Sequence, residues 1–435
     1  MATGDQTLIN FPRESTMKEI SQALQTMAFT QAANLENIST WDQISGLSRN
    51  GYAQKIFDFG DQILEKWTDT AAGQEYDFPW QVTHFENVEL EDGEVIPGTF
   101  LEAHYTTPFG LQFSNRAFLR CPDGLAAGTY HLKLEKDWGN NAKADTYWQF
   151  TLTKAVPAGG SVYGFTQMPD VAPSNWKATS YAADGIATIE TVAVTSGSDG
   201  TDLGTMQHTT RNGNLNSMQE SAYGWNRWKY SAARQWLNST QPKGKWWTKQ
   251  DDWNIAPSQL ATKDGFLCGM PADMLAALKT VKVTTLANTV NDGGVTDITY
   301  DRVFLASMSQ MNVNMSKEEG TVHEYWQRRT NSKTPIEPWK TYPIMIRYSA
   351  ANHTSPQYVF SRSAYRGSAN NVVTVNTSGG VSNTNAWARV RMPRLSSYNQ
   401  QSNNPCTHGC RDRKEKKWQL KQVREMYRTH RRIDS

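Results

Sequence analysis

Residues 358–393 read YVFSRSAYRGSANNVVTVNTSGGVSNTNAWARVRMP, a strand-forming stretch with an unusual density of small polar side chains. Valines recur along it, and five asparagines stand among Ser, Thr and Gly residues. Asparagine is depleted in strands because its side chain competes with the ladder for backbone hydrogen bonds. So many asparagines in a β-patterned segment indicate a surface selected for contact rather than for stability.

The centre of this stretch predicts a hairpin. Segments 372–376 and 381–385 flank the turn residues 377–380, which are Thr-Ser-Gly-Gly. Because side chains alternate along a strand, we expect one set to face the core and the other to face solvent or a partner. The alternation puts Val373 and Val375 on one face, and Val372, Thr374 and Asn376 on the other.

A ligand-binding face of this kind gains affinity from aromatic and arginine anchors that stand among small, adaptable polar groups. The candidate anchors are Phe360, Tyr365, Trp387 and Arg389. Any one of the small polar residues also fits an ordinary loop, because turns favour Asn, Gly and Ser. Only the set together predicts a binding surface. Its adaptable members are Ser368, Asn370, Asn371, Thr374, Asn376, Gly380, Ser382, Asn383 and Asn385.

Two separated blocks of the chain carry a resemblance to a known family. The first contains SRSAYRG at 361–367 and VNTSG at 375–379, followed by Arg391 and Pro393. The second contains YGWNRW at 223–228, followed by Ser231, Arg234 and Trp236-Leu237-Asn238. On these residues, 160–395 resembles the variable proteins of diversity-generating retroelements, of the phage and prophage type. Residues 57–157 resemble the companion domain that precedes the variable domain in such proteins.

The resemblance implies a C-type-lectin-like (formylglycine-generating-enzyme-like) fold and a function in host adhesion. We expect a homotrimeric receptor-binding protein of a phage tail tip or tail fibre, made in the host cytoplasm and carried in the virion. Its expected partners are a bacterial surface protein or glycan and other tail proteins. Asparagine is the expected template residue, because an Asn codon with its two leading adenines randomised reaches many amino acids and no stop codon. The alternative is an enzyme of the formylglycine-generating type, or a host surface module of the same fold without diversification.

Chain length and the pattern of short strand-like and helix-like segments predict a β-rich, α+β protein of several domains. A chain of 435 residues corresponds to about two to four units. Residues 1–50 predict a helical segment that either attaches or oligomerises the protein or packs on its own domain. Residues 51–157 predict a β-sandwich or jelly-roll-like domain, 161–395 the lectin-like ligand-binding domain, and 396–435 a basic tail.

Periodicity predicts particular elements within these domains. In 51–157 we expect strands at 54–59, 75–85, 99–106, 129–134 and 146–153. In 161–395 we expect helices at 231–237 and 271–278. Strands are expected at 281–286 and 301–305, on either side of a turn or longer loop at 291–294.

Charge is concentrated in the tail. The net charge is +2, and residues 406–435 alone carry +6, which leaves −4 for the rest. The body is therefore not expected to bind nucleic acid. The tail fits a solvated appendage, a docking helix or a nucleic-acid contact. No run of 18 apolar residues and no signal-peptide pattern occur, which predicts no membrane insertion.

Catalytic, cofactor and metal motifs are not predicted. The eight histidines show no HExxH spacing, and neither a phosphate loop nor a GxSxG elbow is present. Cys268 stands alone where the formylglycine-generating relatives need a cysteine pair. Cys406, His408 and Cys410 resemble half of a zinc site, for which His430 is the later candidate. Glu337 stays open as an ion ligand without identified partners.

Overall fold

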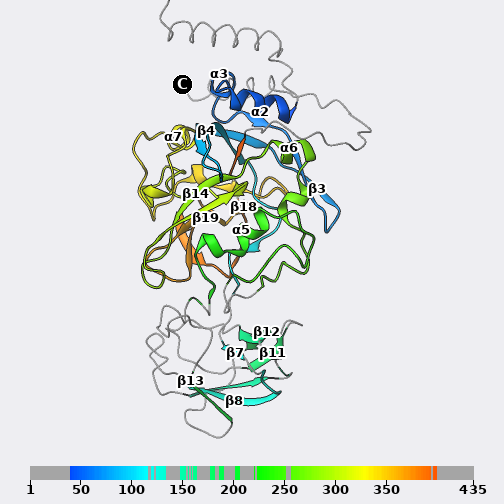
Figure 1. The fold of residues 1–435 in the computed structure, drawn as a ribbon. Helices are drawn as coiled ribbons and strands as arrows, with labels where there is room; N and C mark the ends of the chain where they lie inside the picture. Colours follow the sequence, from blue (N-terminus) through cyan, green and yellow to red (C-terminus); the bar gives the residue numbers. More distant parts are fainter. Residues whose placement is uncertain are drawn as a thin grey trace, which may run out of the picture.

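The computed structural model describes residues 40–115, residues 220 and 223–392 with a gap at 251–255, and 395–398 (Figure 1). Between 119 and 205 it describes seven strands and a few residues beside them. Most of the predicted N-terminal helix, most of the basic tail, and Cys406, His408 and Cys410 lie outside the described residues. The described chain is a mixed α+β structure with several small, mainly antiparallel sheets. None of its described helices is long and apolar enough to cross a membrane.

A five-stranded sheet joins distant parts of the chain. Its order is β1 (Gln62–Ile63), β4 (Trp80–Glu89), β5 (Val95–Ala103), β23 (Leu395–Tyr398) and β16 (Val303–Phe304). β5 and β23 pair antiparallel, with Leu101 opposite Ser396. The sheet therefore contains strands from both sides of the predicted linker at 156–160.

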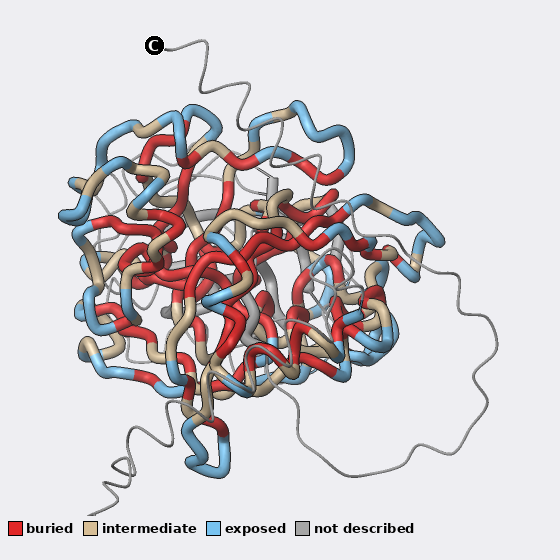
Figure 2. Tube along the Cα trace, turned by 90° about the horizontal axis from the view of Figure 1, so that it is seen from above, coloured by how far each residue is buried: buried red, intermediate tan, exposed pale blue. Residues whose placement is uncertain are grey.

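The largest hydrophobic core also crosses that linker. Trp41, Trp80 and Leu101 share one cluster with Trp236 and Phe360. Figure 2 shows the buried segments running through the middle of this body, with exposed segments at its periphery. Residues 40–113 and 228–392 thus bury their apolar side chains against each other rather than in two separate cores.

Short helices cover this core. α2 (Trp41–Arg49) begins with a capping box between Thr40 and Gln43. A strand was expected at 54–59, but the structure has helix α3 (Ala53–Ile56) there, since Ala53 and Phe57 are buried one helical turn apart. The predicted helices at 231–237 and 271–278 are confirmed as α5 (Ala232–Leu237) and α6 (Ala272–Ala277). The others are α7 (Glu324–Thr330) and the 3₁₀ turns η2 (Trp228–Tyr230), η3 (Phe266–Gly269), η4 (Lys317–Glu319) and η5 (Pro343–Met345).

Small antiparallel pairs complete the body. β14 (Val281–Leu286) is confirmed and pairs with β15 (Thr296–Asp301). The strand expected at 301–305 is confirmed as β16, but it does not pair with β14, because after Asp301 the chain crosses to the five-stranded sheet, where β16 pairs with β23. The remaining pairs are β2 (Lys66–Asp69) with β3 (Gln74–Asp77), β17 (Arg347–Tyr348) with β18 (Pro356–Gln357), and β6 (Leu111–Gln112) with β22 (Arg389–Val390).

A seven-stranded mixed sheet is drawn apart from the body in Figure 1. The strands expected at 129–134 and 146–153 are confirmed as β8 (Gly128–Lys133) and β9 (Tyr147–Leu152), which pair antiparallel. The order of the sheet is β13-β8-β9-β11-β12-β10-β7. Its other strands are β7 (Leu119–Cys121), β10 (Gly160–Tyr163), β11 (Lys177–Tyr181), β12 (Ile186–Glu190) and β13 (Thr201–Thr205).

Candidate functional site

The Asn-rich stretch forms a three-stranded antiparallel sheet in the order β19 (Val359–Ala364), β20 (Asn371–Val375), β21 (Val381–Asn385). The predicted hairpin is confirmed, with Val375 opposite Val381. The expectation that one face of its first strand is open is wrong. Val372 packs in the main core, whereas Val373 and Val375 pack in a second cluster, so the central strand is buried on both faces.

Three asparagines lie on the face of the hairpin that carries the second cluster. Asn383 is opposite Val373, and Asn371 is opposite Asn385. Because cross-strand partners and alternate residues share a face, these three side chains lie beside Val373 and Val375. They are half-buried, whereas the valines are buried. We call Asn371, Asn383 and Asn385 the Asn face.

Asn370 orients two members of the Asn face. Its side-chain amide donates to Asn371 Oδ1 at 3.1 Å and to Asn385 Oδ1 at 2.7 Å. Its own Oδ1 accepts from Ser368 Oγ at 2.9 Å. With their oxygens engaged, Asn371 and Asn385 present their NH₂ groups, and no described side chain or carbonyl accepts from either. The Asn face therefore offers oriented, uncharged hydrogen-bond donors.

An aromatic pair lies next to the Asn face. Tyr365 packs partly against the second cluster, and its ring meets that of Trp339 edge to face, with centroids 5.3 Å apart. Trp339 is 46% exposed and has a φ of 62°. A bulky residue in the left-handed region is an outlier, and such strain is concentrated at functional sites.

The loop that leads into the Asn face is held by Asn226, which is fully buried. The Asn226 side-chain amide donates to the carbonyls of Ser368 at 2.7 Å and Asn371 at 2.8 Å. Its Oδ1 accepts from Asn288 Nδ2 at 3.0 Å. Asn226 thus fixes the backbone of a loop that has no regular ladder of its own.

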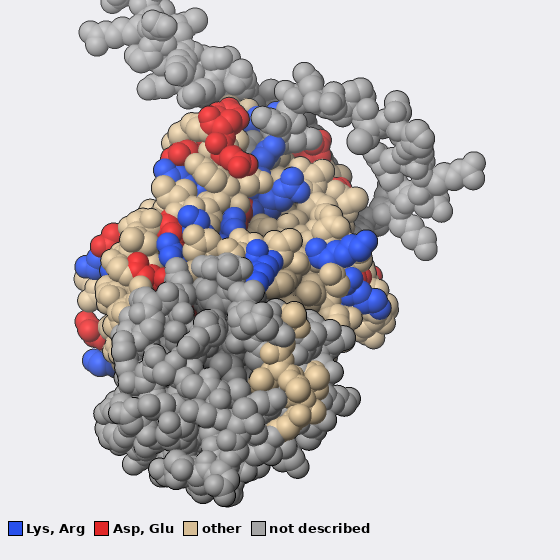
Figure 3. Space-filling view, turned by 60° about the horizontal axis from the view of Figure 1, so that its bottom comes forward, with Lys and Arg blue, Asp and Glu red and all other residues tan. Residues whose placement is uncertain are grey.

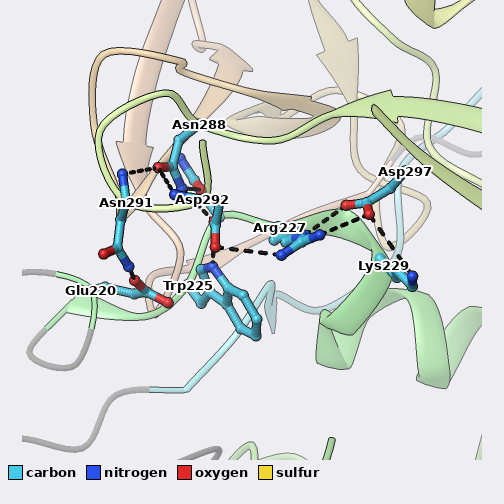
Figure 4. Close-up of polar contacts among 9 residues, drawn as sticks. Glu220, Trp225, Arg227, Lys229, Asn288, Asn291, Asp292 and Asp297 are labelled. Carbon is cyan, nitrogen blue, oxygen red and sulfur yellow. Dashed lines mark hydrogen bonds and ion pairs between the residues drawn. The ribbon is translucent and has the colours of Figure 1, made fainter. Parts of the chain in front are cut away.

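The residues that flank Asn226 join it to a charged network (Figure 4). Asp292 accepts from Trp225 Nε1 at 2.7 Å and from Asn288 Nδ2 at 2.6 Å. Arg227 donates two hydrogen bonds to Asp297, at 2.6 and 2.8 Å, and these raise the pKa of its guanidinium. This network holds Asn288 and the residues next to Asn226 in place, and none of its members belongs to the Asn face.

Arg362, within the SRSAYRG block, is likewise internal. It donates to the Leu305 carbonyl at 2.8 Å and to Gln310 Oε1 at 2.5 Å. Burial lowers its pKa to about 10, although Glu319 opposes that shift. Both blocks that carry the family resemblance therefore supply structural contacts.

Four of the residues expected on the binding surface are buried. Phe360 packs on Phe113 in the main core, and Thr374 lies inside the sheet. Asn370 makes the internal contacts described above. A Cβ on Gly380 would come within 2.7 Å of the side chain of Asn376, which accepts from the backbone of Ser378 and Gly380. Asn376 is thus a turn cap, and Gly380 is the residue that the cap requires.

Three other expected residues lie away from the Asn face. Ser382 is on the opposite face of β21, 3.4 Å from Tyr358 Oη. Arg389 donates to Ser258 Oγ at 3.1 Å, and the Trp387 carbonyl accepts from Gln112 Nε2 at 3.0 Å. The structure therefore brings together Ser368, Tyr365, Asn371, Asn383 and Asn385 from the predicted set.

Sequence reasoning missed Trp339 as a neighbour of the site and Asn226 as the residue that positions it. Asn226 lies in the block YGWNRW, which the resemblance had already marked. The sequence therefore indicated that the residue matters, but not that it positions the loop. Trp339 follows Pro338, and nothing in the local pattern indicates its left-handed backbone.

No described cluster of three His, Cys, Asp or Glu side chains has a geometry that could hold a metal ion. Two hollows were found elsewhere in the body. One, of about 250 Å³, lies between 48–54, 85–87 and 97–99. The other, of about 720 Å³, lies between 90–92, 272–280 and Arg302. Neither includes a residue of the Asn face.

Comparisons with known proteins were made by family model, by curated sequence and by solved structure. The curated proteins gave no match, and neither did the solved structures. Residues 204–394 match the model of a family described as a domain of unknown function, DUF6273. That match includes Asn226, the whole three-stranded sheet and Trp339.

Proposed function

We propose that this chain is a ligand-recognition protein of the retroelement-diversified type, acting as a receptor-binding protein of a phage tail tip or tail fibre. Its lectin-like domain contacts a bacterial surface protein or glycan through the Asn face and Tyr365. The protein assembles as a homotrimer with other tail proteins, and its function is binding rather than catalysis.

The observation that carries this proposal is the difference in burial between the central strand β20 and the Asn side chains on the neighbouring edge strand β21. The central strand β20 is buried on both faces, whereas the side chains of Asn383 and Asn385 project from the edge strand β21 and are half-buried. Edge positions with few packing contacts accept substitution at small cost in stability. A surface whose side chains can be exchanged without unfolding is what diversified recognition requires.

The chemistry of the Asn face also favours recognition. Oriented carboxamides next to Tyr and Trp rings combine adaptable hydrogen bonds with rigid aromatic contact area, as binding surfaces in general do. Acidic and basic groups both lie on the face of the body drawn in Figure 3. The Asn face itself carries no charged side chain, so specificity there would come from amide hydrogen bonds and ring contacts.

The enzyme alternative receives no support from Cys268. Its thiol is partly buried and lies 3.5 Å from the Gln241 carbonyl. Burial, and then Asp264, raise its pKa. A nucleophilic or metal-binding cysteine needs a lowered pKa, so this thiol does not favour the enzyme alternative.

The test uses the full-length protein on an array of bacterial surface glycans and membrane proteins. Replacing Asn371, Asn383 and Asn385 together by Ala should abolish binding. The variant also removes both acceptors of the Asn370 amide, so its melting temperature should fall by several degrees, and a cooperative unfolding transition would show that it still folds. The matched control replaces Thr377 and Ser378, which are exposed at the tip of the same hairpin. Unchanged binding by the triple variant, with the wild type binding a target on the array, would refute the proposal.

A further inference from the structure

We infer that the outer edge of β21 at 383–385 binds an extended segment of a polypeptide partner, which adds a fourth strand to the sheet β19-β20-β21. This inference rests on the proposed function, because it names the class of ligand that the Asn face accepts. It is carried by the directions of backbone groups along that edge.

β21 is the last strand of its sheet in the described chain. The Val381 N–H donates to the Lys340 carbonyl at 2.9 Å, and therefore points away from β20. Since N–H groups alternate in direction along a strand, the N–H groups of Asn383 and Asn385 point outward on the same side. The Asn383 carbonyl also points outward, because in an antiparallel pair the N–H and C=O of one residue lie on the same side.

The protein's own chain already uses the first part of this edge. Thr341 forms an antiparallel bridge with Gly380, and the Tyr342 N–H donates to the Gly379 carbonyl at 3.0 Å. Continued in the same register, Trp339 would lie opposite Ser382, and Pro338 opposite Asn383. The edge is thus competent to pair with a neighbouring strand, and part of it does so.

The covering segment leaves the edge at Trp339. Its φ of 62° turns the backbone out of the extended conformation, and Pro338 has no N–H to donate. No described residue pairs with the outward backbone groups of Asn383. Strained backbone conformations are concentrated at functional sites, so we infer that this turn leaves the edge of β21 accessible to a partner.

A polypeptide fits this edge better than a glycan does. A strand edge presents donors and acceptors at the spacing of another peptide backbone, and strand addition uses that match. Trp339, the residue at which the covering segment leaves this edge, is 46% exposed and its ring meets that of Tyr365, so aromatic contact area is available next to the free part of the edge. Polar Asn side chains along the same edge limit unselective pairing, which an apolar edge would invite.

The experiment separates backbone pairing from side-chain contact at one position. Asn383→Pro removes the outward N–H without removing any bond to β20, and proline is tolerated at such edge positions. Asn383→Ala is the matched control, because it removes the side chain and keeps the N–H. The probe is a linear peptide selected from a random library on the full-length wild-type protein. We expect Asn383→Pro to weaken peptide binding about tenfold more than Asn383→Ala does.

Hydrogen exchange of the wild-type protein is a second measurement that needs no variant. Peptide binding should slow exchange at the amides of Asn383 and Asn385, whereas those of Ser382 and Thr384 are already protected by β20. Equal weakening by the Pro and Ala variants, or unchanged exchange at Asn383, would overturn strand addition and leave the Asn face as a binding site. A library that yields no peptide, while a glycan binds the Asn face, would overturn it too. A selected ligand that both variants and the Asn-face triple variant bind as the wild type does would remove the proposed function as well.

Discussion

Replacing Asn226 by Ala should destabilise the body more than its single side chain suggests. The side chain is fully buried and makes four hydrogen bonds: it donates to the Ser368 and Asn371 carbonyls and, at 3.4 Å, to that of Tyr365, and it accepts from Asn288 Nδ2. The three bonds of 3.0 Å or less are the strong ones. Each is worth about 1 kcal/mol net, and more where a buried partner is left unsatisfied. The loss is therefore about 3 kcal/mol, which corresponds to a fall in melting temperature of roughly 6 to 12 °C.

Two measurements test this: the melting temperature by calorimetry, and the free energy of unfolding in denaturant, monitored by tryptophan fluorescence. Trp225, next to the altered residue, contributes to the fluorescence signal. The matched control is Asn352→Ala. Asn352 is also hydrogen-bonded, to Ser355 Oγ at 2.7 Å, but lies in an exposed turn. Its loss should cost about 0.5 kcal/mol or less. If the two variants melted within about 1 °C of each other, the positioning role of Asn226 would be refuted.

Other perturbations test the remaining contacts. Asp297→Ala leaves the Arg227 guanidinium without its two charge-assisted hydrogen bonds to Asp297, with Asp292 at 3.5 Å as its remaining acidic partner, and should cost about 3 kcal/mol in denaturant unfolding. Gly379→Ala places a Cβ 2.2 Å from the Tyr342 carbonyl at a φ of 83° and should lower the melting temperature by several degrees, whereas Gly367→Ala, with only ordinary contacts, should not. Burial lowers the pKa of His104 to about 4 in the folded protein, whereas an exposed His in the unfolded chain has a pKa of about 6.5. Between these two values the unfolded chain binds a proton that the folded protein does not, so stability should fall as pH drops from about 6.5 toward 4. In His104→Gln that part of the pH dependence should disappear, and an unchanged profile would contradict the assignment.

The local elements of the fold could be predicted from the sequence because they depend on neighbouring residues. Ser231 caps α5 by accepting from the Arg234 N–H, and Thr-Ser-Gly-Gly closes the hairpin between β20 and β21. The shared core could not be predicted in this way. It depends on contacts between distant parts of the chain, such as that between the rings of Trp67 and Trp236, and no local pattern encodes such a partner.

The burial of β20 on both faces did have a signal. Val372, Val373, Thr374 and Val375 form a nearly continuous apolar run, which is typical of a strand covered on both sides rather than of an alternating one. The turn at Trp339 had none, because its backbone conformation is one that the sequence preferences of Trp oppose.

The five asparagines of this stretch have two different structural roles, which cannot be told apart from the residue type alone. Asn370 and Asn376 spend their side-chain hydrogen bonds inside the protein, on neighbouring amides and on the turn backbone. Asn371, Asn383 and Asn385 keep donors that no described group accepts. Mutation of template adenines would change all five codons alike. Substitution of Asn370 or Asn376 removes several internal hydrogen bonds at once, whereas substitution of Asn371 or Asn385 removes one bond from Asn370, and substitution of Asn383 removes none that a described residue makes. Sibling sequences from one lineage should therefore vary at 371, 383 and 385 more than at 370 and 376, because selection for a folded protein acts after the mutation.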